Sequence, residues 1–161
     1  MSDPNWLMIA RSYIGLAEIP GKEHSPTIAG WLTGLKAWWR DDETPWCGVF
    51  VAECMRASAI ELPKHWYRAK GWLDWGVPIA VPIVGCVVVY ERKGGGHVGI
   101  VVGKDQRGNL MTLGGNQGNK VSIMPFALER AIGFRFPQES LPVLAALPVV
   151  NSDGAASTQE A

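Results

Sequence analysis

The pattern of hydrophobic and polar positions changes once along the chain, from helical spacing to strand-like alternation. Apolar residues recur every three or four positions in segments 3–16, 27–39 and 47–60, which predicts helices there. The later segments rich in β-branched or aromatic residues are 81–92, 97–103, 109–115, 120–126 and 131–137. Their short connections favour antiparallel neighbours. The sequence therefore predicts an α+β fold, with N-terminal helices packed on an antiparallel sheet of about five strands.

The end of the chain differs in character from the rest. Residues 1–137 carry every predicted element and form one expected domain. Residues 138–161 form a tail rich in Ala, Pro and Ser, without aromatic side chains. We expect at least the final dozen residues to be disordered. The pattern leaves open whether 141–150 packs on the domain.

Composition narrows the class of protein. With 161 residues, 47% hydrophobic and 19% charged, the chain suits one folded domain. Its fifteen basic and fifteen acidic residues balance, and without a Lys/Arg cluster we expect no nucleic-acid partner. We see neither a signal-peptide pattern nor an apolar run long enough for stable membrane insertion. We therefore expect a chain made in the cytoplasm without a signal peptide.

The third predicted helix places a cysteine in its first turn. Cys47 follows a Pro-Trp pair, and the apolar positions after it share one face, whereas Glu53 and Arg56 are predicted to point elsewhere. A helix N-terminus stabilises a thiolate through unpaired N–H groups and the helix dipole. The N–H of Cys47 would also be free to hold an oxyanion. Cys47 is the candidate nucleophile, and we expect Cys54 and Cys86 to fill the core.

Three histidines compete to be the partner of the cysteine. His24 and His65 lie in proline-containing loops, whereas His97 opens a strand after a triple-glycine turn. Strand alternation puts His97 and Gly99 on one face, where the glycine leaves room for a close neighbour such as a helix end. We expect Cys47 and His97 to meet at one edge of a helix-on-sheet layer.

A histidine base usually needs a polar group that orients it. The next strand ends in "TLGGNQGN", from which Asn116 or Gln117 would emerge beside His97. Alternation places Thr112 and Asn116 on one face and favours Asn116 as the orienting residue. Gln117 is then left to contact the substrate.

Simpler interpretations stand beside these assignments. Any of the cysteines could be a buried filler, and without C-x-x-C or H-x-x-x-H spacing we expect no metal site. The acidic cluster Asp41, Asp42 and Glu43 either caps the helix or supplies oxygen ligands to Ca²⁺.

The tryptophans also divide between two roles. The chain has 8 of them. Trp6 and Trp31 fit core positions of the predicted helices. Trp46, Trp72 and Trp75 are candidates for the walls of a substrate groove, with burial in the core as the alternative.

Three segments taken together resemble a known family: "PWCGVFVAEC", "PIVGCVVVYERKGGGHVGIVVG" and "LGGNQGNKVSI". The chain is similar to the papain-like NlpC/P60 and CHAP peptidoglycan hydrolases, especially the small single-domain phage endolysins. The resemblance implies Cys47 as nucleophile and His97 as base, with the orienting residue at Asn116 or its neighbour. The chain departs from the family pattern at Cys86 and Gly114, where many members carry acidic residues.

The resemblance implies an activity. It implies a monomeric cysteine hydrolase without a cofactor that cuts an amide in the peptide part of bacterial peptidoglycan. The enzyme would be an N-acetylmuramoyl-L-alanine amidase or an endopeptidase, and an endolysin would act on the cell wall from the periplasm. An interbacterial toxin with an immunity partner and a non-catalytic wall-binding module remain alternatives.

Overall fold

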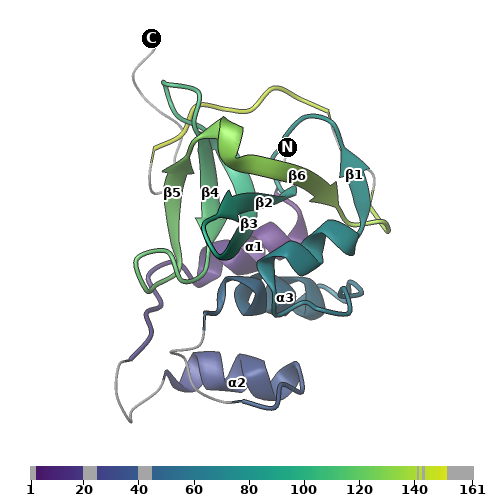
Figure 1. The fold of residues 1–161 in the computed structure, drawn as a ribbon, viewed down its shortest axis with the longest axis vertical. Coiled ribbons are helices and arrows are strands. Elements are labelled where there is room, and N and C mark those ends of the chain that lie inside the picture. The colour runs from purple at the N-terminus through teal and green to yellow at the C-terminus, as the bar shows by residue number, and fades with distance from the viewer. Residues whose placement is uncertain (1–2, 20–24, 40–44, 141, 143, 152–161) are drawn as a thin grey trace.

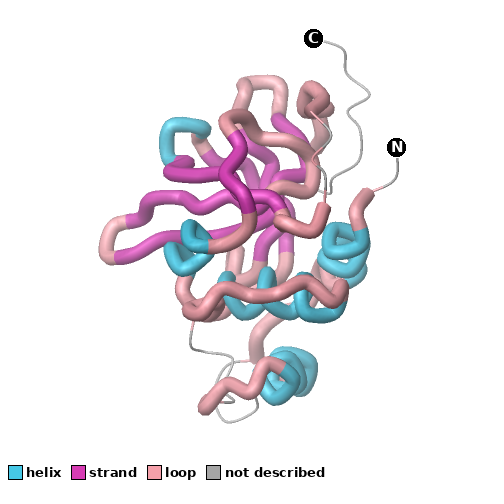
Figure 2. Tube along the Cα trace, turned by 90° about the vertical axis from the view of Figure 1, so that its right-hand side faces the viewer, coloured by secondary structure: helices cyan, strands magenta, loops and turns pink. Residues whose placement is uncertain are grey.

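The computed structural model describes residues 3–19, 25–39, 45–140, 142 and 144–151, and it has an α+β fold. The α-helices gather on one side of the molecule and the strands on the other (Figures 1 and 2). The α-helices are α1 (Asn5–Ser12), α2 (Pro26–Gly34) and α3 (Cys47–Ala57). The strands are β1 (Val77–Ile79), β2 (Val87–Arg92), β3 (Gly95–Lys104), β4 (Leu110–Gly114), β5 (Ser122–Phe126) and β6 (Ala131–Phe136). Two short 3-10 helices are η1 (Ala69–Asp74) and η2 (Leu128–Arg130).

The strands form one antiparallel sheet in the order β1-β6-β2-β3-β4-β5. The sheet is strongly curled, because the rings of Tyr90 in β2 and Phe126 in β5 lie 4.5 Å apart across two intervening strands. In a flat sheet, strands in those positions would be about 14 Å apart. The predicted fold class is confirmed. Strand β1 was not predicted, because its three residues are too few to show alternation.

The α-helices begin near their predicted starts, and α1 and α2 end early. In α1 the N-cap is Pro4, and Asp3, the first residue of the predicted helix, forms an ion pair with Arg11 at 2.7 Å. Helix α2 begins after Ser25, whose hydroxyl accepts a hydrogen bond from the N–H of Ile28 at 3.3 Å. It ends before Lys36, whose φ of 60° is left-handed and turns the chain away from the helix axis.

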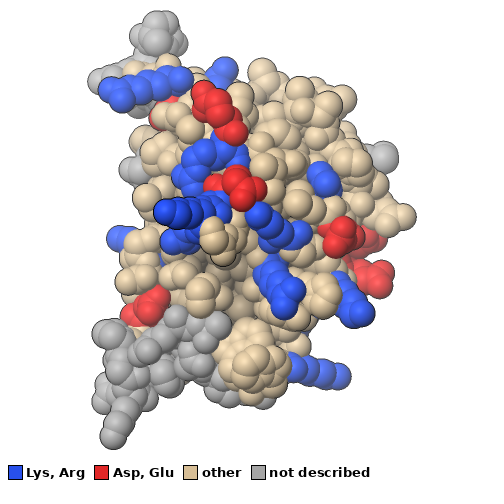
Figure 3. All heavy atoms as spheres, viewed as in Figure 1, with Lys and Arg blue, Asp and Glu red and all other residues tan. Residues whose placement is uncertain are grey.

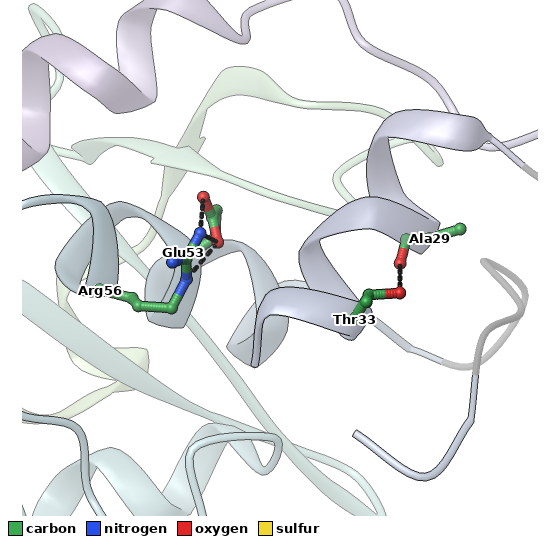
Figure 4. Close-up of polar contacts among 4 residues, drawn as sticks. All are labelled: Ala29, Thr33, Glu53 and Arg56. Atoms are coloured by element: carbon green, nitrogen blue, oxygen red, sulfur yellow. Dashed lines mark hydrogen bonds and ion pairs between the residues drawn. The ribbon is translucent and has the colours of Figure 1, made fainter. Parts of the chain in front are cut away.

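Helix α3 is the central packing element, in contact with α1, α2 and β3. All of its residues from the first to Met55 are buried. Glu53 is only 5% exposed, so the prediction that it points away from the core is wrong. Both carboxylate oxygens accept hydrogen bonds from Arg56 at 2.9 Å (Figure 4), and this ion pair makes the burial possible.

Part of the tail packs on the domain. Lys104 at the end of β3 donates its N–H to the carbonyl of Pro148, and its own carbonyl accepts from the N–H of Val150, both at 2.9 Å. Val150 is buried. The open question about 141–150 is thus answered for its last residues. The predicted disorder of the final dozen falls mainly on 152–161, outside the described residues.

Two further findings concern the described part of the chain. No helix there is long and apolar enough to cross a membrane. No three His, Cys, Asp or Glu side chains of those residues converge as a metal-binding group.

Candidate active site

Cys47 is the first residue of α3, at a helix start without a side-chain cap. The N-cap is Trp46, whose carbonyl accepts the first intrahelical bond, from the N–H of Phe50 at 2.9 Å. The N–H groups of Cys47, Gly48 and Val49 precede that bond, so they have no helical acceptor. The start of α3 therefore places main-chain N–H groups beside the sulfur, as the sequence predicted.

The main chain of β3 also approaches the sulfur of Cys47. The β3–β4 ladder begins at the pair Ile100 and Leu113, so Val98 lies beyond its end. The main-chain N–H groups of Val98 and Gly48 both lower the pKa of the Cys47 thiol, which places them close to the sulfur. The sulfur thus lies against the residue that follows His97. Within the described residues, no hydrogen bond joins Sγ to the imidazole itself.

His97 is held in a stack of parallel rings. Its imidazole is 5% exposed and lies 5.2 Å from the ring of Phe126 and 6.4 Å from that of Tyr90, each at an interplanar angle of 15°. Tyr90 is opposite His97 in the β2–β3 register. The phenol of Tyr90 is 2.6 Å from the hydroxyl of Thr112. These contacts fix the plane of the imidazole.

Gln117 fixes the tautomer of His97. Its Nε2 donates to the carbonyls of Ser122 at 2.8 Å and Thr112 at 3.1 Å, which can only accept. Its Oε1 therefore faces Nε2 of His97, 2.8 Å away. Because Oε1 also only accepts, Nε2 of the imidazole must carry a proton. In the neutral ring, Nδ1 is then the free acceptor.

The structure places Gln117, and not Asn116, against the imidazole of His97. The hydrogen-bond partner of His97 is Gln117, whereas Asn116 is half-buried in the turn with a left-handed φ of 59°. Strand β4 ends at Gly114, so the alternation that favoured Asn116 does not continue into the turn. A Cβ on Gly114 would lie 2.3 Å from Oε1 of Gln117, so the glycine makes room for this side chain.

The close neighbours of Gly99 also differ from the helix end that the sequence predicted there. A Cβ there would lie 2.5 Å from Cγ2 of Thr112 and 3.7 Å from Oε1 of Gln117. The close neighbours of Gly99 are therefore polar side chains of the site, and not a helix end.

The three tryptophans predicted to line a groove lie in the core. Trp46, Trp72 and Trp75 are 1%, 0% and 6% exposed. The indole N–H groups of Trp72 and Trp75 donate to the carbonyls of Trp66 and Glu61. Their apolar surface and their donors are thus both satisfied inside the protein.

Other aromatic residues, missed by the sequence analysis, lie at the surface near the start of α3. Trp38 is 89% exposed and packs edge-on against Trp39, which stacks on Trp66 with centroids 6.0 Å apart. A Cβ on Gly48 would lie 2.6 Å from the carbonyl of Trp66, so this cluster begins beside the residue that follows Cys47. The apolar spacing of 27–39 concealed it, because the spacing suggested that the helix continued.

Burial is the largest influence on the pKa values of Cys47 and His97. It raises the pKa of the Cys47 thiol above its ordinary value, against the opposing effect of the Val98 and Gly48 N–H groups and the charge of Arg92. Burial lowers the pKa of His97, against the hydrogen bond to Gln117. The helix N-terminus therefore does not produce a free thiolate. Both shifts favour a thiol and a neutral imidazole at neutral pH.

The remaining predicted residues take no part in this arrangement. His65 lies 3.1 Å from the hydroxyl of Tyr67. Cys54 and Cys86 are fully buried, and burial raises the pKa of Cys86 to about 12. His24 and the acidic cluster Asp41, Asp42 and Glu43 lie outside the described residues.

A cavity of about 740 Å³ lies at the other end of α3. Trp6, Ser58, Phe136 and Pro148 are among the residues that line it. It contains none of the candidate site residues, so we do not place the reaction there.

A curled antiparallel sheet covered by helices, with a cysteine at a helix start against a histidine strand, defines a papain-like α+β protein. Residues 39–116 match the model of the CHAP domain, a segment that includes both Cys47 and His97. The CHAP part of the resemblance is thus confirmed over that segment. A comparison with curated proteins finds no match.

Proposed function

We propose that this protein is a cysteine amide hydrolase that cuts the peptide part of bacterial peptidoglycan. Cys47 is the nucleophile, His97 the general base, and Gln117 the residue that orients His97. The hydrogen bond from His97 to Gln117 carries this proposal, because it leaves Nδ1 as the proton acceptor. A histidine oriented in this way, on a strand that contacts the helix of Cys47, suits nucleophilic catalysis by a thiol.

The proposed reaction starts from the neutral pair. Nδ1 of His97 takes the thiol proton while Sγ of Cys47 attacks the amide carbonyl carbon, and free N–H groups at the start of α3 stabilise the oxyanion. The imidazolium then protonates the leaving amine, which leaves a thioester on Cys47. His97 next removes a proton from water, which attacks the thioester. A carboxylic acid leaves, and the thiol is restored.

The bond cut is either the N-acetylmuramoyl–L-alanine amide or an amide within or between stem peptides. We infer a phage endolysin as the biological role, on the resemblance of the sequence to the small single-domain members. The interbacterial toxin remains the alternative role for the same chemistry. Neighbouring genes distinguish the two: a holin-like gene supports the endolysin and an immunity gene supports the toxin.

The test is digestion of purified peptidoglycan sacculi, followed by mass spectrometry of the released fragments. Wild type and Cys54→Ala should both release fragments whose new termini identify the bond, whereas Cys47→Ala should release none. Cys54 is the matched control, since it is a buried thiol on the same helix. No release by folded wild type would support the non-catalytic wall-binding module instead.

A further inference from the structure

Two arginines flank His97 on the side of the β2–β3 hairpin. Arg92 ends β2 and lies on the same strand face as Tyr90, which pairs with His97 in the register. The guanidinium of Arg130 lies 5.4 Å from the ring centroid of Phe126 and 5.9 Å from that of Tyr90. Both rings belong to the stack that holds the imidazole. The two cations are therefore neighbours of the candidate base.

Neither arginine is neutralised by a carboxylate within the part of the chain described. The acid next to Arg92, Glu91, pairs with Lys70 at 3.0 Å. Among the described residues, the guanidinium of Arg130 donates to the main-chain carbonyl of Glu91, at 3.4 Å. Figure 3 shows Lys and Arg side chains gathered across the middle of the face viewed in Figure 1. Unpaired guanidinium groups at such a position leave a positive site available to an anion.

The charge of Arg92 reaches both members of the candidate pair. Arg92 and Arg130 each lower the pKa of His97, and Arg92 also lowers that of Cys47. Charges separated from a group by more than about 10 Å of salt solution have little effect on it. Because both arginines change the pKa of His97, both lie close enough to the candidate pair to reach a substrate bound there.

We propose that Arg92 and Arg130 form a carboxylate-binding subsite that holds a free carboxylate of the stem peptide beside the amide to be cut. This inference rests on the proposed function. Guanidinium matches carboxylate geometry with two parallel hydrogen bonds, which makes arginine more selective than lysine for this group. The α-carboxylate of the stem-peptide glutamate suits the subsite, because amides flank that residue on both sides.

The subsite makes the enzyme discriminate between charged and amidated stem peptides. Amidation of the glutamate α-carboxylate removes the charge while it keeps the shape nearly unchanged. The guanidinium groups then face a neutral amide, which offers one acceptor oxygen in place of two. The loss should fall mainly on KM, since the carboxylate takes no part in bond making and is held equally in the ground state and the transition state.

The test compares two synthetic muropeptides that differ only in a free or amidated glutamate α-carboxylate. Wild type should have a kcat/KM about tenfold or more higher for the free carboxylate, the effect of a charge-assisted hydrogen-bonded pair. In Arg92→Gln and Arg130→Gln this ratio should fall toward one. Both substrates are measured on the same enzyme, so a change in the pKa of His97 alters both kcat/KM values equally and leaves their ratio unchanged.

Arg107→Gln is the matched control, since Arg107 lies in the turn beyond β3, at the opposite end of that strand from His97. It removes the same charge and should keep the wild-type ratio. A wild-type ratio near one, or a ratio unchanged in Arg92→Gln, would overturn the subsite while amide hydrolysis stands. If wild type cuts neither muropeptide nor sacculi, the proposed function fails and the subsite with it.

Discussion

At the scale of single residues, one side-chain amide determines the chemistry available to His97. The two carbonyls that accept from Gln117 orient its amide, and the amide in turn decides which imidazole nitrogen is protonated. Gln117 acts on the reaction only through His97, so it is a positioning residue. Its loss should therefore change the rate and the protonation of His97 together.

We expect Gln117→Ala to lower kcat by about a hundredfold with little change in KM, because the imidazole loses its fixed orientation. The hydrogen bond to Gln117 raises the pKa of His97, so its removal should also move the acid limb of the pH–rate profile to lower pH. Asn116→Gly is the control, since it keeps the left-handed backbone of the turn. Equal losses in the two variants would mean that only the turn matters.

The pH dependence of activity follows from a neutral resting pair. His97 accepts a proton only when neutral, and its pKa is lowered from 6.5, so activity should be lost on acidification at a pH below 6.5. Above the raised pKa of Cys47, a thiolate forms without protonating His97, and no proton remains for the leaving amine. The alkaline limb should therefore lie above pH 9.0.

Initial rates on one soluble substrate between pH 4 and 11 measure both limbs. Arg92→Gln should move both limbs to higher pH, because the charge of Arg92 lowers both pKa values. An acid limb above pH 6.5 would contradict the burial argument for His97.

At the scale of elements, α3 combines the reactive sulfur with the packing that holds it in place. The buried carboxylate of Glu53 on this helix is stabilised by its ion pair with Arg56. The guanidinium of Arg56 also packs against the end of α2, where it lies 3.2 Å from the position that a Cβ on Gly34 would take. Because Arg56 is itself partly exposed, the pair has access to water on one side.

We expect Arg56→Ala to lower the free energy of unfolding by about 2 kcal/mol, since it leaves the Glu53 carboxylate buried without a donor. Urea titration measures this change. Thr33→Ala is the matched control: its hydroxyl donates to the Ala29 carbonyl at 3.1 Å on an exposed helix face (Figure 4), and we expect a loss below about 0.5 kcal/mol. Similar losses in both variants would mean that the ion pair contributes little.

A buried and an exposed tryptophan should differ in how much they stabilise the fold. Trp72→Ala in η1 should cost about 3–5 kcal/mol, since it empties a fully buried site. Trp38→Ala should leave the free energy of unfolding within about 0.5 kcal/mol, because its ring is exposed. Thermal or urea unfolding compares the two. A large loss in Trp38→Ala would show that this ring is buried in solution.

At the scale of the whole molecule, the sequence predicted the layers better than the site. The spacing of apolar residues, helical at first and alternating later, located the helices and five of the strands. It did so because burying one face of a helix or strand requires apolar residues at that spacing. Cys47 is the first residue of its helix, as predicted, whereas His97 is the third residue of β3, which begins at Gly95. The place of Gln117 did not follow from the spacing, since the conformation of a turn depends on left-handed residues such as Asn116, which alternation does not describe.

The sequence pattern also did not predict that the site is buried. The curl of the sheet brings Phe126 of β5 onto His97 and Tyr90, a contact that no local period encodes. This stack buries the imidazole and lowers its pKa. A helix start alone would have favoured a thiolate, and only the packed molecule shows a neutral pair.

The central claim is that Cys47 forms a thioester with a fragment of the substrate. The most direct measurement is an acid quench of wild type during turnover of a muropeptide, followed by mass spectrometry of the digested protein. We expect a hydroxylamine-sensitive fragment on the peptide that contains Cys47, and no turnover by Cys47→Ala. A fragment on any other residue, or turnover by Cys47→Ala, would contradict it.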